Sequence, residues 1–392
     1  MTGQPWEIPV GCTVPEALDL GDQDLVYFLL NVGDGDAQVV LLPPVAGERQ
    51  ALIIDARSGW KTLGLLDELR ALGVFGVRSE PRRTPLVALV VATHPHADHI
   101  AGLPAILRAC RGDIAEFWHP GYAMPSAAFT ETMAELDATS TEPRPMVSLP
   151  TAGVTRYYGG AAVTVLSPAV ALRARFDTLG VDPNDASITL MVEFPSSRIV
   201  LDPMASTVER RRLFGERGVS SHRLLLGADA QSLAWAHVAV DFPPLVTAHS
   251  ALARELRDRG HADGLSATVF KVPHHASKHG VTLELMERVS PALSLISSVG
   301  GRGSYGFPHQ LALEQIREAK QSIATTPQLA RRPDWRLGMH YTCAEEGGRP
   351  LGSIAIVCTA GKRTMRVYRF GDGPTDRLQL ADSRRFRSRA RP

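Results

Sequence analysis

The sequence has little cysteine, no long apolar segment and no excess of charge of either sign. Its four cysteines are far apart and form no CxxC pair, which excludes a zinc ribbon and a disulfide framework: Cys12, Cys110, Cys343 and Cys358. The longest purely apolar run, Leu86–Ala92, is much shorter than the roughly 20 residues that span a membrane. We therefore expect no membrane segment.

Positive and negative side chains are balanced. The 42 Lys and Arg residues face 41 Asp and Glu residues, for a net charge of +1. This balance offers no overall attraction to nucleic acid or to an anionic membrane, so any nucleic-acid contact has to be local. The first residues, Met1–Ile8, lack the basic and apolar regions of a secretion signal. We expect a cytoplasmic globular protein, and the oligomeric state stays open.

Several common catalytic motifs are missing. The chain has no GxSxG nucleophile motif, and its glycine-rich segment Gly300–Gly306 lacks the GK[ST] ending of a phosphate-binding loop. No GxGxxG opens a helix after a strand. These absences argue against serine-hydrolase, P-loop and dinucleotide-binding chemistry.

Short apolar runs alternate with helical patterns, which predicts a layered α/β domain. Strands are expected at 25–32, 37–42, 50–54, 85–92, 117–119, 162–166, 188–193, 198–201, 223–226, 267–272 and 292–297, with a hairpin over 351–370. Helices are expected at 61–72, 100–110, 127–136, 230–237, 248–259 and 310–321.

A histidine-rich stretch follows the apolar run 85–92. His94, His96 and His99 fall within six residues, together with Asp98. Residues i and i+2 of an extended segment point the same way, so His94 and His96 can hold one ion. Asp98 and His99, at the start of the next helix, can reach a second ion a few ångströms away. The spacing therefore predicts a metal site.

Other strand ends supply further candidates. Asp55, Asp229 and His274 each come just after a strand-like apolar run, and strand ends meet at one crevice of an α/β sheet. Asp229 can bridge two ions through its two oxygens, although a helix N-cap is the alternative. Asp55 is expected to orient a histidine by a hydrogen bond rather than to bind metal.

The order of these motifs resembles that of the metallo-β-lactamase-fold hydrolases, and within them the C-terminal hydrolase domain of the ComEC competence (DNA-uptake) proteins. The resemblance covers residues 25–310 and rests on these segments: Leu30–Ala37, Ile53–Ala56, Thr93–Leu103, Asn184–Leu190, Leu225–Asp229, Val272–Ser277 and Tyr305–His309. It implies an α/β protein built as an αββα four-layer sandwich. We expect an N-terminal extension (1–22) and a hydrolase domain (23–372) with insertions near 112–160 and 196–265. The last segment (373–392) is rich in arginine and has few apolar anchors, so we expect a basic, mobile tail.

The resemblance also assigns ligands for two divalent ions, zinc or manganese. His94 and His96 hold one ion, Asp98, His99 and His274 hold the other, and Asp229 bridges them. The family pattern has glycine where Ala276 stands and histidine where Phe307 stands. A third histidine for the first ion is not evident, since the family has an Asn–Ser stretch there, and His119 and His222 stay unassigned.

The function expected from this pattern is hydrolysis of a phosphodiester, with DNA as the leading substrate, through a metal-bridged hydroxide assisted by Asp98. His275 and His309 can protonate the leaving oxygen or hold a phosphate, with a supporting hydrogen bond as the alternative. The expected substrate-binding residues are Asn184, Ser187, Ser277, Lys278 and Tyr305, although Lys278 also suits a solvated surface position.

Two other functions remain open. One is hydrolysis of a small ester, lactone or cyclic nucleotide. The other is a non-catalytic regulatory module that binds a protein partner. Basic residues that could contact nucleic acid are confined to Arg210–Arg212 and the arginine-rich tail, and both also suit a solvated face.

Overall fold

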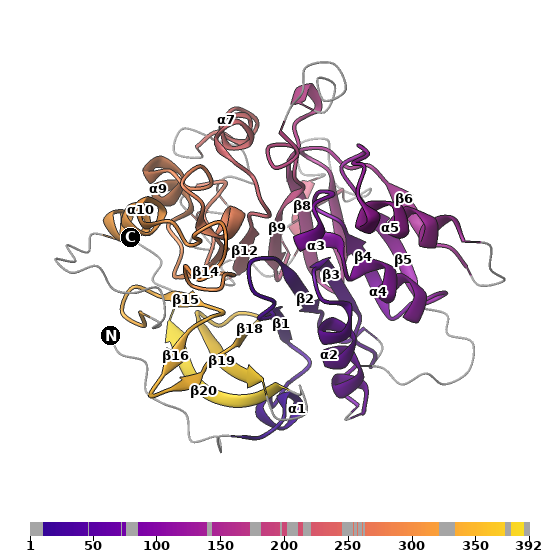
Figure 1. Ribbon diagram of the computed structural model, residues 1–392, viewed down its shortest axis with the longest axis horizontal. Helices are drawn as coiled ribbons and strands as arrows, with labels where there is room; N and C mark the ends of the chain where they lie inside the picture. The colour runs from indigo at the N-terminus through magenta and orange to yellow at the C-terminus, as the bar shows by residue number, and fades with distance from the viewer. Residues whose placement is uncertain are drawn as a thin grey trace.

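The computed structural model of the chain describes residues 11–45, 47–71, 73–75, 85–138, 143–172, 182–196, 198–201, 211–214, 221–244, 254, 257, 261, 263–320, 334–372 and 378–387. Two large β-sheets lie face to face with helices on their outer sides (Figure 1). Within these residues no helix is both long enough and apolar enough to cross a membrane. Of the helix expected over 248–259 only residues 254 and 257 are described, and both are helical; the side chains of Arg210–Arg212 fall outside the described part.

The first sheet has nine strands in the order β20-β19-β18-β1-β2-β3-β4-β5-β6. Its strands are β1 (Asp24–Leu29), β2 (Ala37–Leu41), β3 (Ala51–Ala56), β4 (Val87–Val91), β5 (Ile114–Trp118), β6 (Met146–Ser148), β18 (Ser353–Thr359), β19 (Thr364–Asp372) and β20 (Leu378–Arg387). Strands β3 to β6 are parallel, whereas β1 pairs antiparallel with β2 and β18.

The second sheet has seven strands in the order β15-β14-β13-β12-β9-β8-β7. They are β7 (Thr155–Tyr158), β8 (Ala161–Ser167), β9 (Thr189–Phe194), β12 (His222–Leu226), β13 (Val269–Lys271), β14 (Leu293–Ile296) and β15 (Met339–Tyr341). Strands β12 to β15 are parallel. Two small hairpins complete the strands: β10 (Arg198–Leu201) with β11 (Arg211–Phe214), and β16 (Glu345–Glu346) with β17 (Arg349–Pro350).

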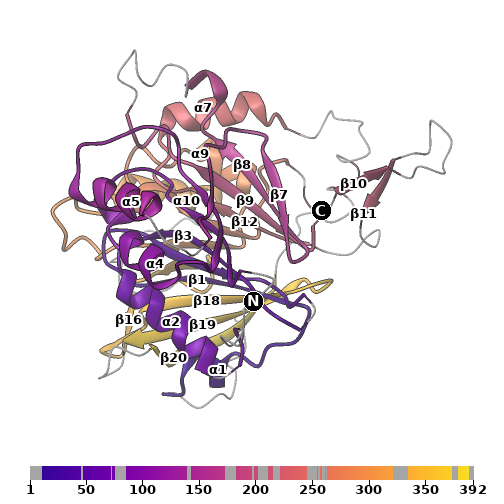
Figure 2. The ribbon, with the colours of Figure 1, turned by 90° about the vertical axis from the view of Figure 1, so that its right-hand side faces the viewer.

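Helices cover both outer faces (Figure 2). The first sheet carries α1 (Val14–Ala17), α2 (Gly59–Ala71), α3 (Ala97–Ile100), α4 (Leu103–Ala109) and α5 (Ala127–Asp137). The second carries α7 (Ser232–Asp241), η2 (Pro273–Ala276), α9 (Leu283–Val289) and α10 (Gln310–Ala319). The predicted αββα sandwich is therefore confirmed.

Strand β1 shows why its sequence is apolar throughout instead of alternating. Leu25, Tyr27 and Leu29 face the second sheet, whereas Val26 and Phe28 face the helices. Successive side chains point to opposite faces of a strand, and both faces of this sheet are covered. Every position of β1 is consequently buried.

Segments expected outside the core of the domain contribute strands to the two sheets. Residues 378–387 of the predicted tail form β20, which pairs with β19 and, through Leu380, with Cys12. Leu378 and Leu380 are buried at alternate positions, so this edge strand has an apolar face despite its arginines. The segment 112–160, expected as an insertion, supplies β5 and the edge strands β6 and β7, and the segment 196–265 supplies the interior strand β12.

Candidate metal centre

The predicted histidines and aspartates meet where the two sheets present the carboxyl ends of their parallel strands. β3 ends at Asp55 and Ala56, and β4 leads into the His94–His99 stretch. In the second sheet β12 leads to Asp229, and β13 leads to His274 and His275. Parallel strands of α/β proteins present their carboxyl ends at one edge, which explains how distant segments converge.

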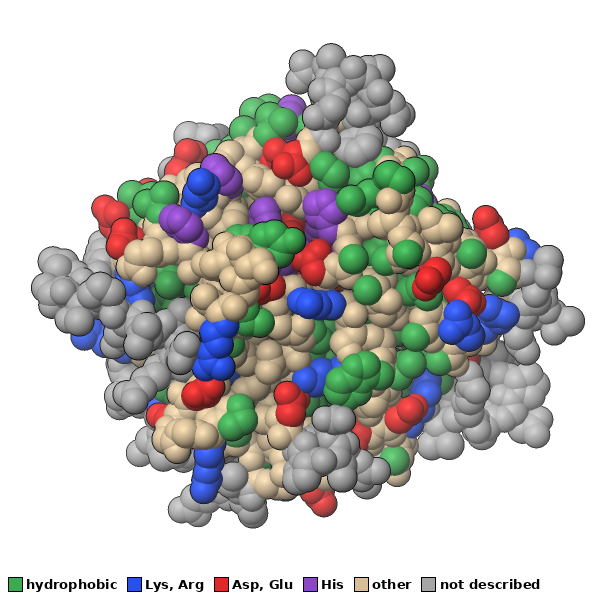
Figure 3. Space-filling view, viewed as in Figure 1, with side chains coloured by type: hydrophobic (Ala, Val, Ile, Leu, Met, Phe, Trp, Pro, Cys, Tyr) green, Lys and Arg blue, Asp and Glu red, His purple; other side chains and the backbone are tan. Residues whose placement is uncertain are grey.

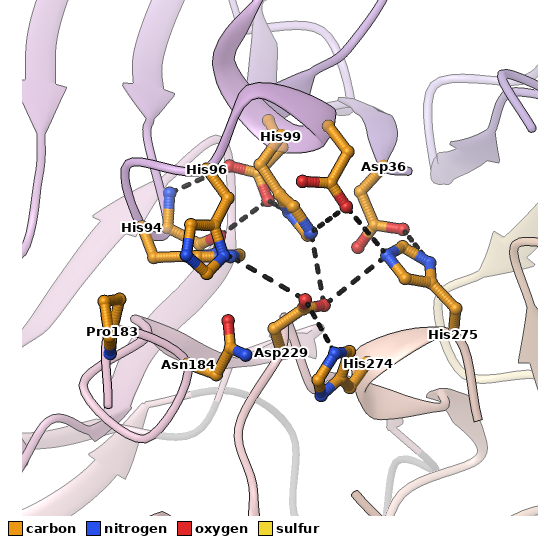
Figure 4. A network of polar contacts seen from close by, with 12 residues as sticks. Asp36, His94, His96, His99, Pro183, Asn184, Asp229, His274 and His275 are labelled. Carbon is orange, nitrogen blue, oxygen red and sulfur yellow. Dashed lines mark hydrogen bonds and ion pairs between the residues drawn. The ribbon is translucent and has the colours of Figure 1, made fainter. Parts of the chain in front are cut away.

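Asp229 lies at the middle of the group, and its two oxygens face different partners (Figure 4). Its Oδ1 lies 3.2 Å from Nε2 of His99 and 3.7 Å from Nε2 of His275. Its Oδ2 lies 3.7 Å from Nε2 of His94 and 3.7 Å from Nε2 of His274. We call Asp98, His99 and His275 the Asp98 set, and His94, His96 and His274 the His94 set.

The Asp98 set is compact. Oδ2 of Asp98 lies 3.5 Å from Nε2 of His275 and 3.8 Å from Nε2 of His99. One ligand atom from each of its three residues and one from Asp229 all lie within 4.8 Å of one another. Ligands bound at about 2.1 Å to one tetrahedral ion are separated by roughly 3.4 Å, so a single cation fits among them.

Unpaired buried atoms test whether the residues suit a cation. Nε2 of His99, Nε2 of His275 and Oδ1 of Asp229 are buried and make no hydrogen bond. Buried polar atoms are rarely left unpaired, and three that face one another suit a bound ion. Histidine nitrogens with carboxylate oxygens, and no cysteine, are ligands acceptable to zinc and to manganese. The donor set therefore fits the expected divalent metal.

Hydrogen bonds behind the histidines decide which ring nitrogen faces Asp229. Nδ1 of His99 lies 2.7 Å from Oδ2 of Asp55, and Nδ1 of His275 lies 3.1 Å from the backbone oxygen of Ser297. Both oxygens only accept, so each Nδ1 donates and the lone pair of a neutral ring belongs to Nε2. The hydrogen bond expected of Asp55 is thus present, on His99.

A hydrogen bond to Thr93 likewise decides which ring nitrogen of His94 faces Asp229. The Thr93 hydroxyl donates to Oδ2 of Asp55 at 2.7 Å, which uses its single hydrogen. Thr93 Oγ1 therefore accepts from Nδ1 of His94, 3.1 Å away, and leaves Nε2 facing Asp229. His96 is half-buried, with Nδ1 3.1 Å from Nε2 of His94.

The assignment of the two adjacent histidines differs from the expectation. His275, rather than His274, joins Asp98 and His99, while His274 faces the other oxygen of Asp229 together with His94. Both residues have left-handed backbone, with φ of 48° and 53°, and their rings lie 6.3 Å apart at 77°. This backbone sends consecutive side chains to the two sides of Asp229, so His274 faces the same oxygen of Asp229 as His94 does.

Left-handed backbone is concentrated at this site. Six non-glycine residues of the described chain have positive φ, and five of them adjoin the centre: Asp55, Ala228, His274, His275 and Ala276. Such conformations are unfavourable for residues with a Cβ and persist only where the surrounding structure imposes them. The folded chain therefore carries local strain in order to aim these side chains.

A buried network that sequence reasoning missed supports His275 from behind. The Ser297 hydroxyl, 3.0 Å from Nδ1 of His275, donates to Oδ1 of Asp36 at 2.6 Å. Asp36 in turn forms a fully buried ion pair with Lys271. The signal in the sequence was the lysine itself, since a charged residue in the apolar strand β13 needs a buried partner.

The pKa values of the residues in the centre are shifted by burial and by the neighbouring charged side chains. Burial alone would lower the pKa of His99, but the carboxylates of Asp229 and Asp55 raise it well above its usual value. Burial and the neighbouring His99 lower the pKa of His94. Burial alone would raise the pKa of Asp229, yet His99 and His275 hold it well below its usual range. Asp229 is therefore an anion at neutral pH.

The other predicted site residues have varied positions. Asn184 is buried beside the His94 set (Figure 4), and Ser187 is also buried. Oδ1 of Asn184 and the hydroxyls of Ser187 and Ser277 are unpaired. Lys278 is exposed. His309 is exposed and caps α10, its Nδ1 accepting the N–H of Leu311 at 3.2 Å.

The two unassigned histidines take other roles. His222 is buried at the start of β12, at the opposite end of that strand from Asp229, and burial lowers its pKa to about 4. His119 accepts the backbone N–H of Gly121.

Comparison with known proteins gives structural neighbours of low identity. The sequence matches no family model and no curated protein. A metallo-β-lactamase from Cronobacter sakazakii, a mutant of its HARLDQ motif, is 16% identical over 75% of this chain and 90% of that chain, with a TM-score of 0.29. The metallo-β-lactamase fold protein YhfI from Bacillus subtilis is 11% identical over 77% and 94%, with a TM-score of 0.36. The architecture described above rests on strand order and layers, independently of these superpositions.

Proposed function

We propose that this protein is a metal-dependent phosphodiesterase of the metallo-β-lactamase type, and that its substrate is DNA. One observation supports the proposal that the protein is a hydrolase. The two oxygens of a single buried carboxylate, Asp229, face two separate sets of histidine and aspartate side chains. Two ions that share a carboxylate suit in-line displacement at phosphorus, since one side can orient the nucleophile and the other the leaving oxygen. The preference for DNA is supported by the resemblance of the motifs to a DNA-uptake hydrolase domain.

The roles of the residues follow from their positions. The Asp98 set would hold one ion, the His94 set the other, and Asp229 both. When bound, these ions would supply an activated water at neutral pH and neutralise charge on the phosphate. Asp55 and Ser297 hold the rings of His99 and His275 so that Nε2 points inward. Asn184 and Ser277 offer unpaired polar atoms to the substrate.

The test is hydrolysis of end-labelled single-stranded and double-stranded DNA in manganese, in zinc or in chelator, with metal content measured on the same samples. Asp98→Ala is the paired variant. DNA cleavage that is lost with chelator and with Asp98→Ala supports the proposal. Cleavage of bis(p-nitrophenyl) phosphate alone would favour a small-ester or nucleotide hydrolase. Bound metal without any cleavage would favour the regulatory module.

A further inference from the structure

Aromatic rings form a continuous row from the metal centre to the surface. Phe307, which stands where the related pattern has histidine, lies 5.3 Å from the ring of His274 and 5.7 Å from that of His275. Tyr305 stacks on Phe307 at 5.7 Å with an angle of 16° between the planes. Tyr305 is 75% exposed, so a ring supported from beneath is presented to solvent. A planar group of a substrate can extend such a stack.

Tyr305 lines the same groove as Asp98. This groove has a volume of about 940 Å³, and two arginines, Arg57 and Arg302, also line it. Arg302 is paired with Glu345 at 3.2 Å. Arg57 donates to the backbone oxygen of Asp34 and, within the described residues, forms no ion pair with a carboxylate. Arg57 is therefore the cation of this groove that is available to an anion.

The groove continues beyond Arg57. An adjoining hollow of about 590 Å³ shares Asn31, Arg57 and Ala101 with it and ends near Trp60, whose side chain is 58% exposed. On this face Figure 3 shows histidine and acidic side chains grouped together, with basic side chains beside them. The path thus runs from the exposed Tyr305, past Asp98 of the metal centre and past Arg57, to the exposed Trp60.

We propose that this path binds single-stranded nucleic acid, with a base stacked on Tyr305 and a backbone phosphate at Arg57. The proposal rests on the proposed function and specifies its substrate. Aromatic side chains interleaved with cations are the recurring means of binding single strands, because every base has a π-face and every nucleotide a phosphate. In a duplex the neighbouring base pairs cover those faces, so the platform selects unpaired nucleotides or strand ends.

The experiment measures binding apart from cleavage. Fluorescence anisotropy with Asp98→Ala as the parent uses a labelled 12-nucleotide oligo(dT), an abasic oligonucleotide of equal length and a duplex. Adding Tyr305→Ala should weaken binding of oligo(dT) by about 5-fold to 150-fold, the loss of one stacked base, and leave binding of the abasic strand unchanged. Tyr157→Ala, which removes an exposed tyrosine from β7, should change neither.

Arg57 is tested by salt dependence. Arg57→Ala should weaken the binding of both oligo(dT) and the abasic oligonucleotide. It should also reduce the magnitude of the slope of log K against log salt concentration by about 0.7, which corresponds to the loss of one phosphate contact on a single strand. Arg156→Ala, at an exposed position of β7, is the matched control and should leave the slope unchanged.

Three results would contradict the proposed binding of single strands at Tyr305. They are equal affinity of the parent and Tyr305→Ala for oligo(dT), equal affinity of the parent for duplex and single strand, and no binding of oligo(dT) by the parent. The two proposals fail differently. If the wild-type protein cleaves DNA and Tyr305→Ala cleaves it equally well, the platform is wrong and the proposed function stands. If oligo(dT) binds through Tyr305 and no DNA is cleaved, the proposed function is wrong.

Discussion

The two halves of the metal centre differ in how firmly their ligands are held. In the Asp98 set, His99 and His275 are fully buried and each has its Nδ1 fixed, by Asp55 and by Ser297. In the His94 set only His94 is braced from behind, by Thr93. His96 and His274 are partly exposed, and Nδ1 of His274 has no hydrogen bond.

This difference means that, of the two proposed ion sites, the one at the Asp98 set is preorganised and the one at the His94 set is adaptable. Groups that hydrogen-bond to a ligand from behind fix its orientation and raise metal affinity. We expect the Asp98 set to bind its ion first and tightly, and the His94 set to bind a second ion that exchanges readily. The looser half lies next to Asn184 and can adjust to the substrate.

Removing the charge of Asp229, which both sets share, should abolish metal binding by both sets. Asp229→Asn keeps the shape of the side chain but removes the charge that both sets face, so we expect both ions to be lost and activity to fall by more than about 1,000-fold. Metal content by mass spectrometry and hydrolysis of the labelled DNA measure this. Asp67→Asn, at an exposed carboxylate of α2, should retain both ions.

Replacing His274 or His275 singly by alanine should affect the two proposed ion sites differently. His275→Ala should weaken the tight ion by about 100-fold or more, whereas His274→Ala should weaken only the second, since each residue faces one oxygen of Asp229. Calorimetric titration of the metal-free protein with zinc resolves the two steps. Identical losses for both variants would contradict the allocation of one histidine to each half.

Removing the hydroxyl behind His275 should make the Asp98 set less rigid and weaken its affinity for metal. Ser297→Ala removes the hydroxyl that links His275 to Asp36, and affinity for the tight ion should fall by about 10-fold to 100-fold. Ser294→Ala, at a buried serine of β14, the strand that leads to Ser297, is the control and should bind zinc like the wild type. If the two variants bound alike, the brace behind His275 would not tune the metal.

Lys320, which lies outside the metal centre, should make its own contribution to how the free energy of unfolding changes in alkaline solution. Burial lowers the pKa of Lys320 to about 7, so from pH 7 to about 10 the unfolded chain holds a proton that the folded chain has released. The free energy of unfolding of the chelated protein should therefore rise with pH over that window, by about 1.4 kcal/mol per pH unit from this group.

Lys320→Met should remove that slope and leave zinc binding unchanged. Urea unfolding at pH 7, 8 and 9 in the presence of chelator measures it. A slope unaffected by the substitution would mean that another group, the metal centre included, sets the alkaline dependence.

That these histidines and aspartates would come together could be predicted, because their chemistry is local in sequence. His94, His96, Asp98 and His99 form one short stretch, and Asp229 follows an apolar strand, so type and spacing were enough to select them. The allocation of His274 and His275 was not predictable, since it depends on two consecutive left-handed residues that no propensity favours. Phe307 was visible as a departure from the family pattern, but its contacts with both histidines depend on the path of the loop.

Long-range pairing explains the remaining errors. Asp36 and Lys271 neutralise each other across 235 positions of sequence, which only the docking of the two sheets brings about. β20 forms because Leu378 and Leu380 find a buried face beside β19, although the arginines around them suggest a solvated segment. The layers were easier to predict, because strand β1 and the amphipathic α10 carry their burial pattern within a few residues.

The order of the strands along the chain bears on how the protein is made. Strand β1 gains its second neighbour in the first sheet only when β18, between residues 353 and 359, has been made. The centre likewise needs Ser297, so a chain emerging from the ribosome carries the His94–His99 stretch long before its partners exist. Until then those histidines are exposed to any free transition metal. We expect correct loading of the centre to follow completion of the chain, and refolding in excess metal to trap the amino-terminal half in unproductive complexes.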